Sequence, residues 1–280
     1  MESINFAVNA KINLSLAVTG RRSDGYHNLD TVMQTVDISD SVFIKKSAFF
    51  SFECNKFGGE ENIACKAAQR FFAAVGKEPS AEIKIEKSIP SSAGLGGGSA
   101  DAAGVLVGLN TLFQTRLSSG ALCKIAVSLG ADVPFLIAGG TQRAGGIGEI
   151  LTPLHPIPDC AFLVVLAGKK PSTAEMFARL DGIKYPKPNI ERTVKAINNG
   201  SYAELINALG NSFSALWSGE EITERLYECG ADAVALSGSG PARFAVFKNA
   251  ENAAAAKVLL EKDGITAYLC RPTKSSVIFK

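Results

Sequence analysis

The chain has 280 residues, of which 46% are hydrophobic and 20% are charged, and its 29 basic residues nearly balance its 27 acidic ones. This composition is that of a globular protein and excludes a disordered chain, and the length suits one or two domains of ordinary size. A formal net charge of +2 provides no basic surface for nucleic acid, so we expect no nucleic-acid partner.

The cysteines and the apolar stretches bear on the cellular compartment. The six cysteines are scattered and none forms a C-x-x-C pair, which argues against a zinc site or a disulfide framework and favours a reducing cytosol. The longest apolar stretch covers about residues 160–168, whereas roughly 20 residues are needed to span a bilayer. The N-terminal residues also lack the pattern of a signal peptide. We therefore expect a cytoplasmic protein with no membrane partner.

The first half of the chain is predicted to mix strands and helices. Apolar periodicity predicts strands over 4–18, 29–52 and 81–87, and helices over 62–75, 99–113 and 121–129. Residues 4–18 alternate loosely, which favours a half-buried pair of strands. A polar loop over residues 19–27 follows, with Asp24-Gly25 at its tip.

The second half is predicted to form an α+β unit. Glycines over residues 139–148 and prolines between 153 and 158 interrupt the chain, so we place a boundary there and expect domains over 1–150 and 151–280. The same periodicity predicts strands over 162–166, 233–236, 244–247, 266–269 and 277–279, and helices over 173–180, 220–229 and 250–260. This order favours a sheet with helices packed on one face.

A glycine-rich segment over residues 90–101, PSSAGLGGGSAD, lies between a predicted strand and a predicted helix. Glycine permits positive φ and close approach to the backbone, and the free N–H groups at a helix start attract phosphate. Ser99 adds a hydroxyl at the expected helix cap. The apolar Leu95 argues against a flexible linker. The segment has neither the lysine of a Walker A loop nor the last glycine of a Rossmann fingerprint, but it predicts phosphate binding.

This segment resembles the PxxxGLGSSAA phosphate loop of the GHMP kinases, a family that includes galactokinase, homoserine kinase and mevalonate kinase. Three further segments resemble one branch of that family: AKINLSLAVTGRRSDGYHNLDT, SLGADVPF and SGSGPARFAVF. In that branch ATP phosphorylates the 2-hydroxyl of a cytidine diphosphate-linked methylerythritol on the non-mevalonate route to isoprenoids. The resemblance covers nearly the whole chain in the expected order.

The resemblance implies a fold and a catalytic pair. The N-terminal domain is expected to be like domain 2 of ribosomal protein S5 and the C-terminal domain to be ferredoxin-like, with the active site in the cleft between them. Lys11 and Asp132 match the catalytic lysine and aspartate. Phosphoryl transfer to an alcohol requires positioning, charge neutralisation and a proton acceptor. Pro134 is expected to prevent helix continuation, so that Asp132 projects from a turn, where the Lys11 ammonium keeps its carboxylate ionised.

The resemblance also implies binding residues. Tyr26 and Phe177 match aromatic residues that hold the cytosine, and flat rings suit a base. His27 is expected to offer one ring nitrogen as donor and the other as acceptor to the cytosine edge. Asn13, on the same strand face as Lys11, is placed to orient the substrate hydroxyl, and Thr173 offers a hydroxyl close to Phe177.

ATP, accompanied by Mg²⁺, is the implied co-substrate. Its expected binding residues are the loop and two candidates for the adenosine end: Pro90, Ser91, Ser92, Ala93, Gly94, Leu95, Gly96, Gly97, Gly98, Ser99, Ala100, Lys87 and Asn62. The sequence shows no cluster of metal ligands, so we assign no metal site to the protein and expect Mg²⁺ to arrive with ATP.

Three departures from the family pattern fall in the second half: Ser212 where aspartate is expected, Ala242 where threonine or serine is usual, and Lys169-Lys170 in place of a Pro-Gly-like pair. Two alternatives stay open. One is a GHMP kinase with a homoserine or mevalonate-type acceptor, which Tyr26 and His27 disfavour. The other is a catalytically silent nucleotide-binding regulator, which the presence of both Lys11 and Asp132 disfavours. The sequence does not give the oligomeric state.

Overall fold

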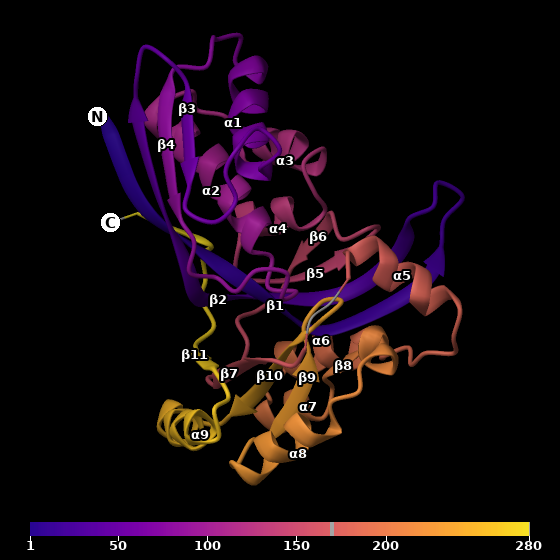
Figure 1. Ribbon diagram of the computed structural model, residues 1–280. Helices are drawn as coiled ribbons and strands as arrows, with labels where there is room; N and C mark the ends of the chain where they lie inside the picture. Colours follow the sequence, from indigo (N-terminus) through magenta and orange to yellow (C-terminus); the bar gives the residue numbers. More distant parts are fainter. Residues whose placement is uncertain (169–170, 280) are drawn as a thin grey trace.

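Two β-sheets form the framework of the protein, as the computed structural model, which describes residues 1–168 and 171–279, shows (Figure 1). The strands of the first sheet are β1 (Ser3–Arg21), β2 (His27–Lys46), β3 (Ser51–Cys54), β4 (Ala81–Glu86), β5 (Thr141–Gly145), β6 (Ile150–Pro153), β8 (Gly210–Asn211) and β12 (Val277–Phe279). Those of the second are β7 (Ala161–Leu166), β9 (Ala233–Leu236), β10 (Ala242–Phe247) and β11 (Ala267–Cys270). The predicted α+β class is confirmed.

The long antiparallel pair β1 and β2 runs across the whole molecule (Figure 1). The prediction of a pair of strands over residues 4–18 is wrong, because a single strand covers them. From Val8 to Val18 every residue of this strand is buried, so both faces are covered and the two-residue alternation is lost. Shifts in the pairing register after Asn9 and Asn13 add to the irregular pattern.

Four helices cover one side of the first sheet: α1 (Ile63–Ala74), α2 (Gly97–Leu112), α3 (Ser119–Val127) and α4 (Asp132–Ala138). Helix α2 lies very close to β1, since a Cβ placed on Gly104 would be only 2.2 Å from Val8 Cγ1. Any larger residue there would push the helix off the sheet. This close packing fixes the start of α2 relative to β1, which matters for the site described below.

The second sheet packs on both faces. Leu163 and Val165 of β7 join a cluster with α8 (Glu220–Glu228) and α9 (Ala250–Lys262). Phe162 and Val164, which point the opposite way, join the main core with the first sheet. The expected helices therefore cover one face, and the other face is closed by the rest of the molecule. The remaining helices are α5 (Thr173–Asp181), α6 (Ile190–Asn198), α7 (Tyr202–Ile206) and the 3₁₀ helix η1 (Ser212–Leu216).

The division of the chain near residue 150 stays a prediction. Strand β6 crosses the predicted boundary and strands β8 and β12 lie in the predicted second domain, yet all three pair within the first sheet. The C-terminal strand β12 pairs with β1 and so returns to the start of the chain. None of the described helices is long and apolar enough to cross a membrane.

Candidate active site

A cleft of about 1140 Å³ collects almost all of the predicted site residues. It is lined by parts of β1 and β2, the glycine-rich loop, the start of α4 and one side of α5. The predicted residues that line it are Lys11, Asn13, Tyr26, His27, Asn62, Lys87, Pro90, Ser91, Ser92, Ala93, Gly94, Leu95, Gly96, Gly97, Gly98, Ser99, Asp132, Thr173 and Phe177. Ala100 is the exception, because its side chain is buried within α2 and faces the core.

The glycine-rich loop delivers the N-terminus of α2 to this cleft. The helix begins at Gly97, two residues earlier than predicted, and its cap is Gly96, whose φ of +72° suits glycine. Ser99 is thus the third helical residue and not the cap. The N–H groups of Gly97, Gly98 and Ser99 precede the first intrahelical bond, which Ala100 makes to Gly96. These donors and the helix dipole favour an anion at this point of the cleft.

The loop is held by the segment that joins β9 and β10. Gly94 has a φ of +85°, and a Cβ on it would lie 2.4 Å from the carbonyl oxygen of Ser237. The Ser237 hydroxyl donates to the carbonyl oxygen of Gly94 over 3.0 Å and accepts from the Asn13 N–H over 3.2 Å. The backbone N–H of Ala242 donates to the carbonyl oxygen of Ala93 over 3.0 Å. Since Ala242 is fully buried and uses its backbone here, this departure leaves the loop supported.

Lys11 and Asp132 lie next to each other beside the loop. Lys11 Nζ is 3.4 Å from Asp132 Oδ2, and it donates to Asn13 Oδ1 over 2.7 Å. The predicted placement of Asn13 and Lys11 on one strand face is therefore confirmed. A Cβ on Gly96 would lie 3.0 Å from Lys11 Cγ, so the loop, the ammonium and the carboxylate are neighbours. The Lys11 side chain is buried and the Asp132 side chain is about one third exposed, which leaves the carboxylate open to a reactant.

Asp132 is the first residue of helix α4, so the prediction that it projects from a turn is wrong. Pro134 does not stop the helix because it is the third helical residue, where a backbone N–H has no intrahelical acceptor to lose. A carboxylate in the first helical turn is also favoured by the helix dipole. The helix start therefore fixes Asp132 more firmly than a turn would.

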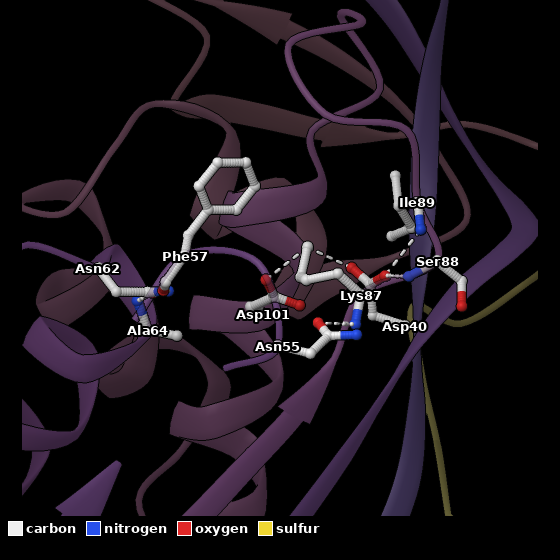
Figure 2. Close-up of polar contacts among 9 residues, drawn as sticks. All are labelled: Asp40, Asn55, Phe57, Asn62, Ala64, Lys87, Ser88, Ile89 and Asp101. Carbon is white, nitrogen blue, oxygen red and sulfur yellow. Dashed lines mark hydrogen bonds and ion pairs between the residues drawn. The ribbon is translucent and has the colours of Figure 1, made fainter. Parts of the chain in front are cut away.

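Lys87 lies behind the glycine-rich loop in a buried cluster with Asp40 and Asp101 (Figure 2). Lys87 Nζ donates to both carboxylates, and its distance to Asp101 Oδ2 is 2.6 Å. Asp40 also accepts the backbone N–H groups of Ser88 and Ile89, which lead into the loop. The ammonium predicted to contact the adenosine end of ATP is thus already paired inside the protein.

The two acidic members of this cluster share one buried lysine. Burial raises the pKa of Asp101 to about 7, although the charge of Lys87 acts in the opposite direction. Burial opposes the charge on Lys87, but its contacts with Asp101 and Asp40 outweigh this and raise the pKa of Lys87. Asp101 Oδ1 is buried and has no hydrogen-bond partner among the described residues. Burial therefore disfavours a full negative charge on Asp101.

Asn62 is the cap of helix α1 (Figure 2). Its Oδ1 accepts the N–H of Ala64 over 2.8 Å, and its Nδ2 donates to the carbonyl oxygen of Phe57 over 2.6 Å. Both ends of the amide are used locally, which is the common role of asparagine at this position. Asn62 lines the cleft, but its contacts are those of a structural cap.

Tyr26, His27 and Phe177 lie at the other end of the cleft. Phe177 stacks on His27, with ring centroids 4.7 Å apart and an interplanar angle of 17°, and its ring meets the edge of Phe213. His27 Nε2 lies 2.7 Å from Asp181 Oδ1. The expectation that both ring nitrogens of His27 face a base is therefore wrong, because one of them is taken by Asp181. Tyr26 is 60% exposed and leaves its ring free for a ligand.

The second-half departures fit this end of the cleft in different ways. The Ser212 hydroxyl is buried, accepts the N–H of Val18 over 3.0 Å and donates to the carbonyl oxygen of Pro186 over 2.8 Å. A serine can do both, whereas an ionised aspartate only accepts. Thr173 is the first residue of α5 and lines the cleft. Residues 169–170 lie outside the described part of the chain.

Sequence reasoning missed three residues that shape the cleft: Asp40, Asp181 and Ser237. Ser237 stands in the SGSGPAR segment, which was singled out for its resemblance and not for a contact. Asp181 lies one residue beyond the helix predicted over 173–180. In α5 it follows Phe177 by four residues, and this spacing places both on one face. Asp40 gave no signal, because it is 47 residues away from Lys87.

The chain matches known families and structures over most of its length. The family pattern described as GHMP kinases N terminal domain matches residues 62–140, and the one described as GHMP kinases C terminal matches residues 193–264. A 4-diphosphocytidyl-2-C-methyl-D-erythritol kinase from Alkaliphilus metalliredigens is 36% identical over 260 residues, which cover 89% of each chain.

Solved structures agree in fold. A crystal structure of 4-(cytidine 5'-diphospho)-2C-methyl-D-erythritol kinase matches with a TM-score of 0.79 and 30% identity, and the match covers 96% of this chain and 99% of that one. The homoserine kinase of Cytophaga hutchinsonii matches with a TM-score of 0.77 over 100% of this chain and 98% of that one, at 17% identity. The second likeness concerns the fold alone.

Proposed function

Because the chain belongs to the family of 4-diphosphocytidyl-2-C-methyl-D-erythritol kinases within the GHMP kinases, we propose that it transfers the γ-phosphate of ATP to the 2-hydroxyl of the methylerythritol unit of a cytidine diphosphate-linked substrate. The observation that carries this proposal is the single cleft shared by the glycine-rich loop, the Lys11–Asp132 pair and the aromatic end. A donor phosphate, an acceptor hydroxyl and a base can all reach one cavity.

The glycine-rich loop is proposed to hold the phosphates of ATP, which binds with Mg²⁺ as part of the substrate. The free N–H groups of Gly97, Gly98 and Ser99 would bind phosphate oxygens. Among the described residues no group of three histidine, cysteine or acidic side chains is placed to hold a metal. The ion would neutralise phosphate charge, and the hydrogen-bond donors of the protein would hold the phosphates in place.

Asp132 is proposed to accept the proton of the acceptor hydroxyl. The oxygen then attacks the γ-phosphorus, and ADP leaves with the electrons of the broken bond. Lys11 Nζ lies 3.4 Å from Asp132 Oδ2, where its positive charge can neutralise the negative charge of the transferred group. Asn13 fixes the ammonium by accepting from Lys11 Nζ, so that the pair is oriented before the substrate arrives.

An ATP-consumption assay across acceptors tests the proposal. We expect ADP release with the cytidine diphosphate-linked methylerythritol and none above background with homoserine or mevalonate. Mass spectrometry of the product would place the new phosphate. Turnover of homoserine or mevalonate in preference to the cytidine substrate would refute the proposed acceptor, and no turnover of any acceptor by the folded protein would refute the kinase activity.

A further inference from the structure

The position of Asp181 in its helix does not favour a carboxylate. It is the last residue of α5, and a negative charge at a helix C-terminus is opposed by the helix dipole. Its contact with Arg21 is long, at 3.5 Å, and Arg21 is largely exposed, so this ion pair contributes little. Its short contact, at 2.7 Å, is with the buried ring of His27.

This contact determines which ring nitrogen of His27 carries hydrogen. An ionised carboxylate only accepts hydrogen bonds, so a neutral His27 must donate through Nε2–H and keep a lone pair on Nδ1. Among the described residues no hydrogen bond is recorded for Nδ1. The Phe177 ring, stacked on His27 and braced by the edge of Phe213, resists a flip that would exchange the two nitrogens. His27 lines the cleft, and we take the lone pair on Nδ1 as the acceptor that its ring offers to a ligand there.

We propose that Asp181 is a positioning residue that holds His27 as a hydrogen-bond acceptor and so selects an amino-bearing pyrimidine over an oxo-bearing one. This inference rests on the proposed function, which brings a cytidine-linked substrate to the cleft. The exocyclic amine of cytosine donates, whereas the corresponding carbonyl of uracil accepts. Facing Nδ1, cytosine forms a hydrogen bond and uracil places two acceptors together, an arrangement that a site rejects.

The first measurement compares two substrates in three proteins. The kcat/KM values for the cytidine- and uridine-diphosphate-linked methylerythritol are determined for the wild type, Asp181→Ala and Glu175→Gln. Glu175 is the matched control, since it lies on the same helix, pairs with Arg179 over 2.6 Å and does not line the cleft. We expect Asp181→Ala to lower the cytidine-to-uridine ratio by about two- to tenfold, the value of one ordinary hydrogen bond.

The change should appear in KM for the cytidine substrate and leave kcat nearly unaltered, because the reacting groups lie at the other end of the cleft. Glu175→Gln should keep the ratio of the wild type. If Asp181→Ala does not fold, Asp181→Asn serves instead. Its amide oxygen can still accept Nε2–H, but its NH₂ group can equally turn toward the ring and favour the other tautomer, so the ratio should also fall.

The second measurement does not depend on activity. The chain has two histidines, so ¹⁵N NMR of the imidazole groups gives two sets of signals, and His155→Gln assigns them. The wild type should show His27 with Nε2–H and an unprotonated Nδ1, and Asp181→Ala should show a mixture of tautomers. A protonated Nδ1 in the neutral wild-type ring overturns the inference.

The outcomes separate this inference from the proposed function. A wild type that phosphorylates the cytidine substrate, together with an unchanged cytidine-to-uridine ratio in Asp181→Ala, overturns the role of Asp181 alone. A folded wild type that shows the expected tautomer but does not phosphorylate the cytidine substrate overturns the proposed function, and the claimed selection falls with it.

Discussion

The two ends of the cleft are built in opposite ways. Behind the phosphate loop, Lys87, Asp40 and Asp101 have side chains that are 5% exposed or less. Within the described part of the chain, these side chains pair only with each other and the backbone. At the aromatic end, Tyr26 is 60% exposed, and the Asp181 carboxylate is about one quarter exposed. One end is closed before any ligand binds, whereas the other leaves the Tyr26 ring open.

This difference matches what each end has to bind. A phosphate tail carries several charges, and donors fixed in advance stabilise charge without further rearrangement. A base is held by flat contact and a few hydrogen bonds, which an exposed ring can supply after the ligand arrives. Changes behind the loop should therefore alter stability, and changes at the aromatic end should alter substrate binding.

Asp132→Asn should have the largest effect, and it tests whether the open carboxylate between the two ends does chemistry. We expect kcat to fall by about 10²–10⁴-fold, the usual contribution of a general base. The free energy of unfolding should change by about 1 kcal/mol or less, because the lost carboxylate is about one third exposed, which weakens its interactions with Lys11 and with the helix dipole. Steady-state kinetics and urea unfolding measure both. Near-wild-type kcat would remove Asp132 from the mechanism.

Lys87→Met should strongly destabilise the closed end. It leaves Asp40 and Asp101 buried without a cation, and breaking a buried ion pair in this way costs about 3–5 kcal/mol. The matched control is Lys84→Met on strand β4, which ends one residue before Lys87, since Lys84 is 46% exposed and pairs with Glu82 and Glu53 at the surface. That change should cost less than about 1 kcal/mol. Urea unfolding that gives equal losses for both variants would contradict the contrast.

Local sequence predicted the elements with clear periodicity and missed those that depend on neighbours. Helix α1 begins within one residue of its prediction because Asn62 caps it and apolar residues recur at helical spacing. Helix α4 was missed because Pro134 normally argues against a helix, and only its place in the first turn makes it harmless. Strand β1 was divided in two because burial on both faces hid its alternation.

The residues of the site were predicted better than their partners. Motifs brought Lys11, Asp132 and the glycine-rich loop to one cleft, as expected. Lys87 and Asn62 were assigned to the adenosine end, yet both side chains have partners within the protein. Asp40, the partner of Lys87, lies 47 residues away on another strand, and such a pairing depends on the sheet order, which the sequence does not give.

The stability of the closed end, which holds Lys87, Asp40 and Asp101, should depend on pH. Burial raises the pKa of Asp101 from its ordinary 3.8 to about 7 in the folded protein. The folded state therefore holds a proton that the unfolded chain has released, and the stability this gives is complete below about pH 4 and is lost as the pH rises through about 7.

Asp101→Asn has no carboxyl group to titrate at this position. Between about pH 4 and pH 7, the free energy of unfolding of the wild type should therefore fall relative to that of the variant. Above this range the two curves should run parallel. Urea unfolding across a pH series measures the difference. Parallel curves over the whole range would show that Asp101 does not carry this proton, and the closed end would then hold two ionised carboxylates on one lysine.

Tyr26→Ala should give the smallest of these effects and one confined to the open end. Loss of the ring face should weaken binding of the cytidine substrate by about 1–3 kcal/mol, the usual value of stacking on one base. Stability should hardly change, because Tyr26 is 60% exposed. Tyr26→Phe keeps the ring and is the control, so its Kd should stay near the wild-type value. Calorimetric titration measures all three proteins. If both variants weaken binding equally, the hydroxyl and not the ring face holds the base, and the open end would recognise its ligand through fixed polar groups as the phosphate end does.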